Sequence, residues 1–310
     1  MNDKVCVITG WTGDLWPELI QRLKNEWYTM CVIGRNKEKL LSLFNSTLEE
    51  WKDSVYSCDL TKKADRDETI NQIVKEHWAP DLLINNAAII WDPMRLDEHS
   101  EELIENIIDT NLKWTILFTK NVIEKMKESE SFVKRQIINV LSTAGLYPYP
   151  ERSIYAATKA WMKHFTESIG LEYKSDLIEI NSICPWPVNW ETVERVIKDR
   201  ANKKGISYEE MKKSFSRIVS DDGSLLDKEE FFNAIDMIVK WELSDLYWEI
   251  INKNNMFTWH TLGIDKKWVY DKTNKKIITK NPKLKDLKKK QLIQYDKRRY
   301  IVEYDQEKGN

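Results

Sequence analysis

The sequence lacks the features that mark several classes of protein. Its 310 residues include four cysteines without a CxxC spacing, and at least Cys6 and Cys31 sit in apolar runs, which fits free thiols in a reducing compartment. Lysines and arginines (48) nearly balance aspartates and glutamates (50), so charge favours neither nucleic acid nor an anionic membrane surface. No stretch approaches the apolar length of a membrane span, and a strand is expected shortly after Met1 without a signal sequence. We expect a cytoplasmic protein that acts on a small molecule, with no nucleic-acid, membrane or metal partner.

Glycine is scarce and tryptophan is abundant. The chain has 9 glycines and 14 tryptophans, and the two together make up about the share that glycine alone has in most proteins. Trp27 and Trp78 stand where an expected helix gives way to a strand, and Trp11 and Trp16 lie in an expected phosphate-binding turn, all places that favour a residue without a Cβ. Some bacterial genetic codes read UGA as glycine and others read it as tryptophan. We infer that most or all 14 tryptophans stand for glycines of the native protein; the alternative is a tryptophan-rich chain with ordinary aromatic core positions.

Apolar, β-branched runs alternate with segments of helical period along the first 250 residues. The expected strands are Lys4–Thr9, Thr29–Ile33, Val55–Cys58, Asp81–Ile84, Gln136–Leu141, Leu177–Ile183 and, as a seventh, Tyr247–Ile251. Helices are expected between them, including one long helix over about Ser100–Lys127 and another over about Ser153–Tyr173. This alternation predicts an α/β fold with a doubly wound, Rossmann-type parallel sheet of about seven strands and helices on both faces.

The chain divides into two parts by composition. Residues 1–254 are expected to form the Rossmann-type domain, with a charged helical flap over a pocket at about 188–220. Residues 255–310 form a charged, lysine-rich extension in which Trp268–Tyr270 and Lys276–Ile278 are expected to pair as a hairpin.

The first strand leads into a glycine-containing turn before a helix. Residues 9–16 read T-G-W-T-G-D-L-W, and glycine at positions 11 and 16 would make this T-G-G-T-G-D-L-G. Glycines let the chain turn sharply and bring backbone N–H groups against a pyrophosphate at the positive end of a helix. The turn therefore predicts a dinucleotide site with Gly10, Thr12, Gly13, Asp14 and Leu15 as contacts.

Two further positions bear on the cofactor. Arg35 follows the second strand, where NAD enzymes place an acid for the ribose 2′-hydroxyl, and an arginine there suits a 2′-phosphate. We expect NADP(H), with NAD(H) as the alternative if Arg35 is only a solvated loop residue. Asp59, after the third strand, is placed either to meet the adenine or to cap the helix that starts near Lys62.

A tyrosine and a lysine are spaced for acid/base chemistry. Tyr155 and Lys159 are four residues apart on an expected helix and so share a face, where the ammonium group can lower the pKa of the phenol toward neutrality. Chance pairs of this kind are common on helix surfaces. Ser142 strengthens the prediction, because it follows an apolar strand whose carboxyl end faces the ligand crevice of a doubly wound sheet.

Together these segments resemble the classical short-chain dehydrogenase/reductase family over about residues 4 to 252. The matching segments are Thr9–Trp16, Asp59-Leu60, Asn85-Asn86-Ala87-Ala88, Asn111, Ser142–Gly145, Tyr155–Lys159 and Cys184–Val188. The resemblance implies Tyr155 as proton donor or acceptor, Ser142 as the hydroxyl that polarises the substrate carbonyl, and Lys159 as the ligand of the nicotinamide ribose that also tunes Tyr155. It further implies a water on Asn111 for proton relay, stabilisation of the central strands by Asn86, and a homodimer or homotetramer. The remaining cofactor contacts it implies are Leu60, Ala87, Ala88, Pro185 and Val188.

The chain departs from that family at two places. The restored pattern T-G-x-x-G-x-x-G is closer to the extended branch of the family, although the thirteen-residue spacing from Ser142 to Tyr155 is that of the classical branch. Trp186 stands where the family has the glycine of a Cys-Pro-Gly-Pro run, and Trp16 stands at the last glycine of the turn. An indole at either position would occupy the space of pyrophosphate or nicotinamide.

The expected activity is an NADP(H)-dependent interconversion of a carbonyl and a secondary alcohol, run in cells as ketone reduction. Candidate substrates are 3-oxoacyl thioesters, sugars and small ketones, and residues 146–151 are expected to line the pocket together with the flap. The alternative is a catalytically silent dinucleotide-sensing or scaffold protein of the same fold, which the long basic tail favours, as do the tryptophans if they are native.

Overall fold

The computed structural model describes residues 4–10, 16–44, 48, 52–90, 93–129, 134–185, 187–216 and 225–240, together with the backbone of six further strands between 248 and 304. No helix within these residues is both long enough and apolar enough to cross a membrane.

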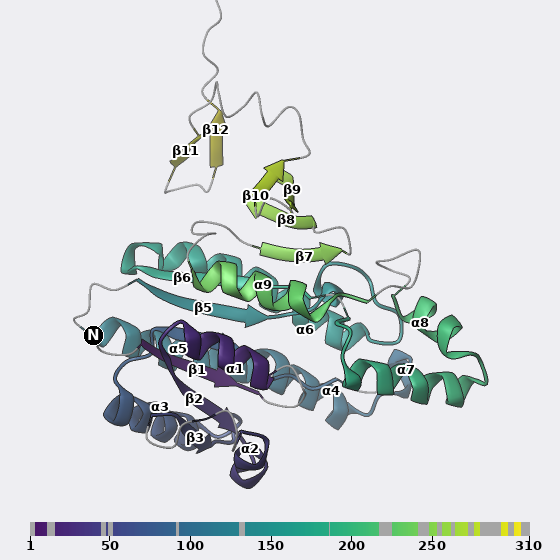
Figure 1. Ribbon diagram of the computed structural model, residues 1–310, viewed down its shortest axis with the longest axis horizontal. Coiled ribbons are helices and arrows are strands. Elements are labelled where there is room, and N and C mark those ends of the chain that lie inside the picture. The colour runs from purple at the N-terminus through teal and green to yellow at the C-terminus, as the bar shows by residue number, and fades with distance from the viewer. Residues whose placement is uncertain are drawn as a thin grey trace, which may run out of the picture.

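A parallel sheet forms the centre of the fold (Figure 1). Its strands are β1 (Lys4–Thr9), β2 (Tyr28–Gly34), β3 (Ser54–Ser57), β4 (Leu82–Asn85), β5 (Arg135–Val140) and β6 (Ile178–Ile183), in the order β3-β2-β1-β4-β5-β6. All five pairings are parallel, with Cys6 of β1 opposite both Met30 of β2 and Leu82 of β4. The order reverses between β1 and β4, and a crevice for a ligand opens at such a reversal, outside the carboxyl ends of the strands. The doubly wound fold predicted from the sequence is confirmed.

The prediction of a seventh strand in this sheet is wrong. A strand does form there, as β7 (Trp248–Asn252), but its backbone pairs antiparallel with β8 (Met256–Thr261). These two strands, β9 (Ile264–Asp271) and β10 (Lys276–Thr279) make a separate sheet of order β10-β9-β8-β7, so the described parallel sheet has six strands. The residues expected to form a hairpin pair in β9 and β10, with Tyr270 opposite Ile277. The last described strands, β11 (Ile293–Asp296) and β12 (Ile301–Tyr304), pair with each other. The sheet of β7 to β10 includes residues on both sides of position 254, where the sequence predicts a domain boundary. That boundary stays a prediction.

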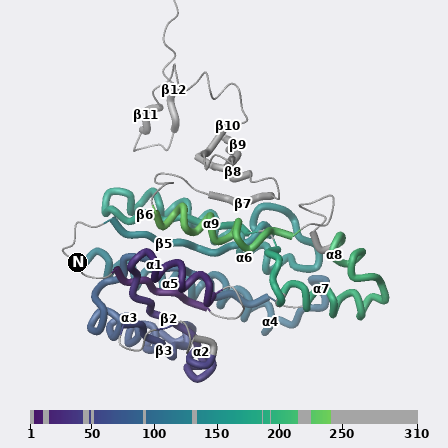
Figure 2. The backbone as a smooth tube through the Cα atoms, in the orientation of Figure 1, coloured from purple at the N-terminus to yellow at the C-terminus, as the bar shows by residue number. Residues whose placement is uncertain are grey.

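Helices connect and cover the strands of the parallel sheet. They are α1 (Trp16–Asn25), α2 (Lys37–Phe44), α3 (Lys63–His77), α4 (Glu101–Ile108), α5 (Trp114–Glu128), α6 (Ser153–Glu172), α7 (Glu191–Lys204), α8 (Tyr208–Ser216) and α9 (Lys228–Val239). The single helix expected over about 100–127 is in fact α4 and α5 joined by a π-helical turn at Asp109–Lys113. Such turns inside helices are frequent at functional sites. The backbone trace places α7 and α8, in the segment expected to be a flap, beyond the sheet (Figure 2).

Alternate residues of each strand enter two different apolar cores. On one face, Cys6 and Ile8 of β1 pack with side chains of α1 and α9. On the other face, Val5 and Val7 pack with side chains of α3, α5 and α6. Successive side chains of a strand point to opposite faces, so a sheet buried on both sides needs continuous apolar runs. This is why the strands could be recognised as unbroken runs in the sequence.

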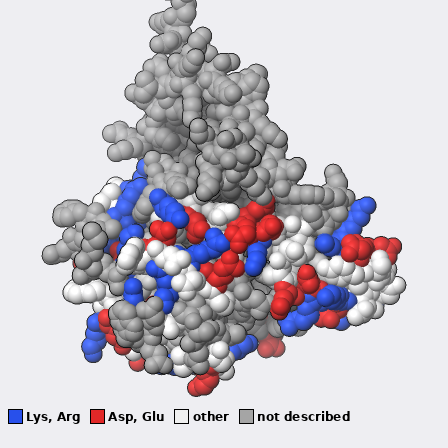
Figure 3. All heavy atoms as spheres, in the orientation of Figure 1, with Lys and Arg blue, Asp and Glu red and all other residues white. Residues whose placement is uncertain are grey.

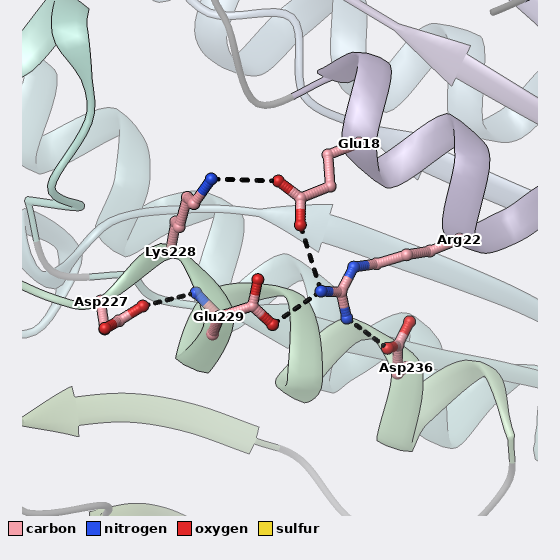
Figure 4. Close-up of polar contacts among 6 residues, drawn as sticks. All are labelled: Glu18, Arg22, Asp227, Lys228, Glu229 and Asp236. Atoms are coloured by element: carbon pink, nitrogen blue, oxygen red, sulfur yellow. Dashed lines mark hydrogen bonds and ion pairs between the residues drawn. The ribbon is translucent and has the colours of Figure 1, made fainter.

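Helices α1 and α9 are also joined by ion pairs (Figure 4). The guanidinium of Arg22 contacts Asp236 at 3.1 Å and Glu229 at 2.7 Å on α9, and Glu18 at 3.2 Å on its own helix. Lys228 lies 3.4 Å from the second oxygen of Glu18. On the face of the molecule that includes this cluster, acidic and basic side chains of the described residues lie interspersed (Figure 3).

Two tryptophans adopt backbone conformations that favour glycine. Trp27 has a φ of 68°, and Trp78, which ends α3, has a φ of 80° with a ψ of −178°. The second combination is essentially confined to glycine, since a Cβ clashes with the backbone there. Both side chains are 72% exposed and so gain little from packing. Trp16, by contrast, is 4% exposed and packs in the core beside α9.

Candidate active site

The end of β1 approaches the end of β4 too closely for any side chain on Gly10. This glycine has a φ of 72°, and a Cβ built on it would lie 1.9 Å from the Cα of Ala87. Asn86 holds the approach, because its side-chain amide donates a 2.6 Å hydrogen bond to the carbonyl oxygen of Gly10 and its backbone N–H donates to Thr9. These contacts therefore fix where the chain leaves the carboxyl edge of the sheet.

The rest of the predicted cofactor turn lies outside the described residues. This applies to Thr12, Gly13, Asp14 and Leu15, and to Trp11 and Trp186. The described end of the turn is Trp16, whose indole is buried in the core.

The two residues predicted to contact the adenosine end lie beside each other at the ends of β2 and β3. The Arg35 side chain is exposed, and its backbone oxygen accepts a hydrogen bond from Ser57. Partial burial of Asp59 raises the pKa of its carboxyl group, but hydrogen bonds from Thr61 and the nearby charges of Lys62 and Arg35 prevail, so the net pKa is lowered. Helix α3 begins after Lys62, so Asp59 is not its N-cap. Leu60, next to it, packs against the core and accepts a hydrogen bond from Arg66.

Ser142, Tyr155 and Lys159 come together at the carboxyl end of β5. Ser142 follows that strand and begins a short 3-10 turn, Thr143–Gly145, which packs against α6 so tightly that a Cβ on Gly145 would lie 2.8 Å from the backbone of Lys159. Tyr155 and Lys159 lie one turn apart near the start of α6, with the ammonium nitrogen 5.7 Å from the centre of the phenol ring. Lys159 is 4% exposed and donates a 3.0 Å hydrogen bond to the backbone oxygen of Val140.

Burial governs the titration of this group. Burial raises the pKa of Tyr155 above its usual value, against the hydrogen bond with Ser142 and the positive charge of Arg152, which both lower it. Burial also lowers the pKa of Lys159 to about 8. Burial therefore outweighs the groups that lower the pKa of Tyr155, and its net pKa is raised.

Asn111 sits in the π-helical turn between α4 and α5 and is 2% exposed. Its side-chain oxygen accepts from the backbone N–H of Ile89 at 2.7 Å, and its nitrogen donates to the carbonyl oxygen of Ile89 at 2.9 Å and to Thr158 at 3.5 Å. Asn111 thereby connects the segment after β4 to helix α6. Ala88 and Ile90, on either side of Ile89, line the cavity described next.

A cavity of about 350 Å³ opens beside Ser142, Tyr155 and Lys159. The cavity is also lined by flap residues of α7 and by four of the predicted cofactor contacts, namely Asn86, Ala88, Pro185 and Val188. Val188 is 2% exposed and bridges to Leu226, which holds the segment after β6 in place. The cavity thus brings together described residues predicted for catalysis and for the nicotinamide end of the cofactor.

A chain of buried polar side chains behind the site was not predicted from the sequence. The Asn85 amide donates to Thr119 at 2.8 Å and to Asn139 at 2.9 Å, and Asn139 donates to Thr166 of α6 at 2.8 Å. All four side chains are buried, so these bonds fix β4, β5, α5 and α6 relative to one another. An asparagine inside each of two apolar strands was the available signal.

Two arginines of the cavity were also missed. Arg152 immediately precedes α6 and is 9% exposed, and Arg200 lies on α7. Both line the cavity that contains Ser142 and Tyr155. Arg152 stands three residues before Tyr155, and that spacing was the signal.

The chain is similar in sequence to known oxidoreductases. The family model described as short chain dehydrogenase matches residues 4–201. An uncharacterized oxidoreductase of Staphylococcus aureus is 28% identical over 189 residues, which cover 61% of this chain and 80% of that protein. A 3beta-hydroxysteroid dehydrogenase of Mediterraneibacter gnavus is 25% identical over 200 residues, 64% of this chain and 71% of that protein.

Solved structures share the fold. Actinorhodin polyketide ketoreductase with NADPH, in a variant form, superimposes with a TM-score of 0.67 at 24% identity, covering 76% of this chain and 90% of that one. NAD⁺-bound xylitol dehydrogenase superimposes with a TM-score of 0.67 at 21% identity, covering 77% of this chain and 92% of that one.

Proposed function

We propose a function for this chain from one premise, namely that it belongs to the short-chain dehydrogenase family and is therefore an oxidoreductase acting on CH–OH or C=O groups. Its reaction is reversible hydride transfer between a nicotinamide dinucleotide and a carbonyl or secondary-alcohol carbon of a small molecule. In cells the enzyme runs as an NADPH-dependent ketone reductase.

One observation carries the proposal: Ser142, Tyr155 and Lys159 converge on a single cavity at the carboxyl edge of the sheet. A hydroxyl, a phenol and a buried ammonium group at one place can polarise a carbonyl, move a proton and hold a polar cofactor. Lysines are rarely buried to this extent without a partner, and the backbone oxygen of Val140 is a weak counterpart for a full charge. The position of Lys159 therefore supports a binding role.

The described residues fit a nicotinamide dinucleotide. Gly10 follows β1 in a left-handed conformation, which permits the tight turn that the first glycine of a dinucleotide-binding loop makes. The cavity lies at the same edge of the sheet. When bound, the dinucleotide supplies or accepts the hydride at C4 of its nicotinamide.

Each residue has a separate part in reduction. Ser142 donates a hydrogen bond to the substrate carbonyl oxygen, which makes its carbon more electrophilic. Tyr155 gives its phenolic proton to that oxygen as negative charge develops there, and the Lys159 ammonium stabilises the resulting phenolate while binding the nicotinamide ribose. Asn111 holds Ala88–Ile90 at the cavity wall and supports the water through which Tyr155 is reprotonated.

Arg35 supports NADP(H) over NAD(H), because an exposed guanidinium at the end of β2 can pair with a 2′-phosphate. The variant Arg35→Ala should weaken NADPH binding at least tenfold and NADH binding less than twofold, as measured by cofactor fluorescence. Lys37→Ala, an exposed cation two residues on, is the matched control and should change neither. Equal loss of both cofactors would show that Arg35 is only solvated.

The activity itself is tested by NADPH consumption with a panel of ketones, sugars and 3-oxoacyl thioesters. Two proteins are compared: the chain with its 14 tryptophans, and a glycine-restored protein that has glycine at those 14 positions. We expect reduction of at least one class, and loss of that reduction in Ser142→Ala. NADPH binding without any turnover would contradict the proposal and favour a dinucleotide-sensing protein.

The same proposal extends to a homodimer or homotetramer in the cytoplasm. The four cysteines are free and buried, which supports a reducing compartment. Light scattering of the purified protein would give the mass of the assembly, and a monomer would contradict this part.

A further inference from the structure

The charged groups of the active-site cavity are all of one sign. Its described lining contains Lys159, Arg152 and Arg200 but no aspartate or glutamate. The remaining lining is largely apolar, with Ile90, Val193 and other aliphatic side chains. A cavity of this kind holds an uncharged chain against its walls and a negative group against its cations.

A second cavity shares part of its lining with this one. Tyr149, Arg152 and Arg200 line both spaces, and the second has a volume of about 740 Å³. Its described lining adds three further basic side chains, Arg95, Lys203 and Lys204, and two acidic ones, Glu98 and Glu151. Basic side chains thus outnumber acidic ones in the described lining of both cavities, although Arg95 is paired with Asp97, and this balance of charge favours an anion.

Arg152 is held close to the reacting groups. It is 9% exposed, and its backbone N–H donates to the carbonyl oxygen of Tyr149. Burial raises the pKa of both Tyr149 and Tyr155, and the charge of Arg152 acts against that rise. Arg200 belongs to α7, a different element, so the cavity lining takes its two arginines from separate parts of the chain. A guanidinium presents paired N–H groups that match the oxygens of a carboxylate or phosphate.

We propose that the substrate is a carbonyl compound with an anionic group, a carboxylate or a phosphate, held between Arg152 and Arg200 while its carbonyl meets Ser142 and Tyr155. This rests on the proposed function, since it names the substrate class of the same site. The apolar wall between the two ends accepts the carbon chain that separates the carbonyl from the anion.

Matched substrate pairs test the proposal in the NADPH-loaded enzyme. The pairs are a 3-oxo acid with its methyl ester, and a keto-alcohol phosphate with the free keto-alcohol. We expect kcat/KM to be at least tenfold higher for the anionic member of at least one pair, and the pair that shows it distinguishes carboxylate from phosphate. Arg200→Met should remove at least tenfold more kcat/KM from the anionic member than from the neutral one, mainly through KM. Arg200→Lys should restore part of this loss.

Lys198→Met, on the same helix but in neither described cavity lining, is the control and should behave as wild type. Equal use of both members of each pair, or equal losses for both in Arg200→Met, would overturn the proposal.

A binding measurement separates this proposal from the proposed function. Glutarate and propyl phosphate carry the anion without a carbonyl, and dimethyl glutarate and propanol are their neutral counterparts. Calorimetry should show binding of an anionic probe that weakens at least tenfold in Arg200→Met, with no comparable binding of the neutral ones. Such binding without ketone reduction would keep the anion site and contradict the reductase activity. Absence of binding by both anions in the wild type would overturn the anion site itself.

Discussion

The side-chain amide of Asn111 forms two hydrogen bonds with the backbone of one residue, Ile89: its oxygen accepts from the Ile89 N–H at 2.7 Å and its nitrogen donates to the Ile89 carbonyl at 2.9 Å. Asn111 occupies the π-helical turn that separates α4 from α5. The turn therefore places the Asn111 amide against the segment that follows β4, and residues of that segment line the cavity.

This pairing predicts a pH-dependent effect of Asn111→Asp. Above the pKa of the new carboxyl group, a buried carboxylate would face the Ile89 carbonyl and lose the donor, which should destabilise the protein by about 2–4 kcal/mol. A protonated carboxyl can donate in place of the amide, so its folded-state pKa is raised and the loss should shrink as pH falls toward 4. Urea unfolding at pH 5 and pH 8 measures this. A loss of the same size at both values would contradict the pairing.

Lys159 should make stability depend on pH in the alkaline range. Its pKa is lowered to about 8 by burial, whereas a lysine in the unfolded chain titrates near 10.4. Between these values the unfolded state binds more protons, so this group's contribution to stability rises with pH across about 8 to 10.4. Lys159→Met lacks this contribution, and the stability of the wild type relative to it should rise across the window by up to about 3 kcal/mol. A constant difference between the two proteins would show that Lys159 titrates normally.

The tryptophans with positive φ predict unusual gains from glycine. Trp78→Gly should stabilise the protein by about 1–3 kcal/mol and Trp27→Gly by about 1 kcal/mol, because the strain of a Cβ in these conformations is removed. Trp161→Gly is the control, since it lies within α6 and is 59% exposed, and it should destabilise by about 1 kcal/mol. Thermal or urea unfolding of the three variants gives the signs. Destabilisation by Trp78→Gly would remove the structural support for the hypothesis that the tryptophans stand for native glycines.

The sequence of peptides from the native protein tests directly whether the tryptophans stand for glycines. Trp114 and Trp190 have buried indole N–H groups without a hydrogen-bond partner, although buried tryptophans usually find one. Mass spectrometry of the protein from its own cells should show glycine at Trp27, Trp78 and Trp114. Tryptophan in those peptides would contradict the hypothesis.

Much of the fold was predictable because its strands are buried on both faces and stand out as apolar runs such as Lys4–Thr9. The seventh strand was assigned to the wrong sheet, because an isolated apolar run does not indicate which neighbour its backbone will pair with. The break in the helix at Asp109–Lys113 was not predictable from periodicity either, since the contact that accompanies it, Asn111 with Ile89, joins residues distant in sequence.

The site was predictable where its residues are close in sequence, as with Tyr155 and Lys159 on one helix. Arg200 escaped notice because α7 reaches the cavity only through the tertiary fold. The burial that raises the pKa of Tyr155 was not predictable for a similar reason: burial depends on all the surrounding elements, whereas spacing along a helix describes only one of them.

The central claim is that Tyr155 transfers the proton during carbonyl reduction. Tyr155→Phe removes one oxygen and keeps the ring in its place at the start of α6. In the glycine-restored protein this variant should bind NADPH within about threefold of the parent, while kcat/KM for the best carbonyl substrate falls by at least about 100-fold, because only the acid is lost. Steady-state kinetics beside a fluorescence titration of NADPH measures both. Near-normal turnover in Tyr155→Phe would contradict the assignment.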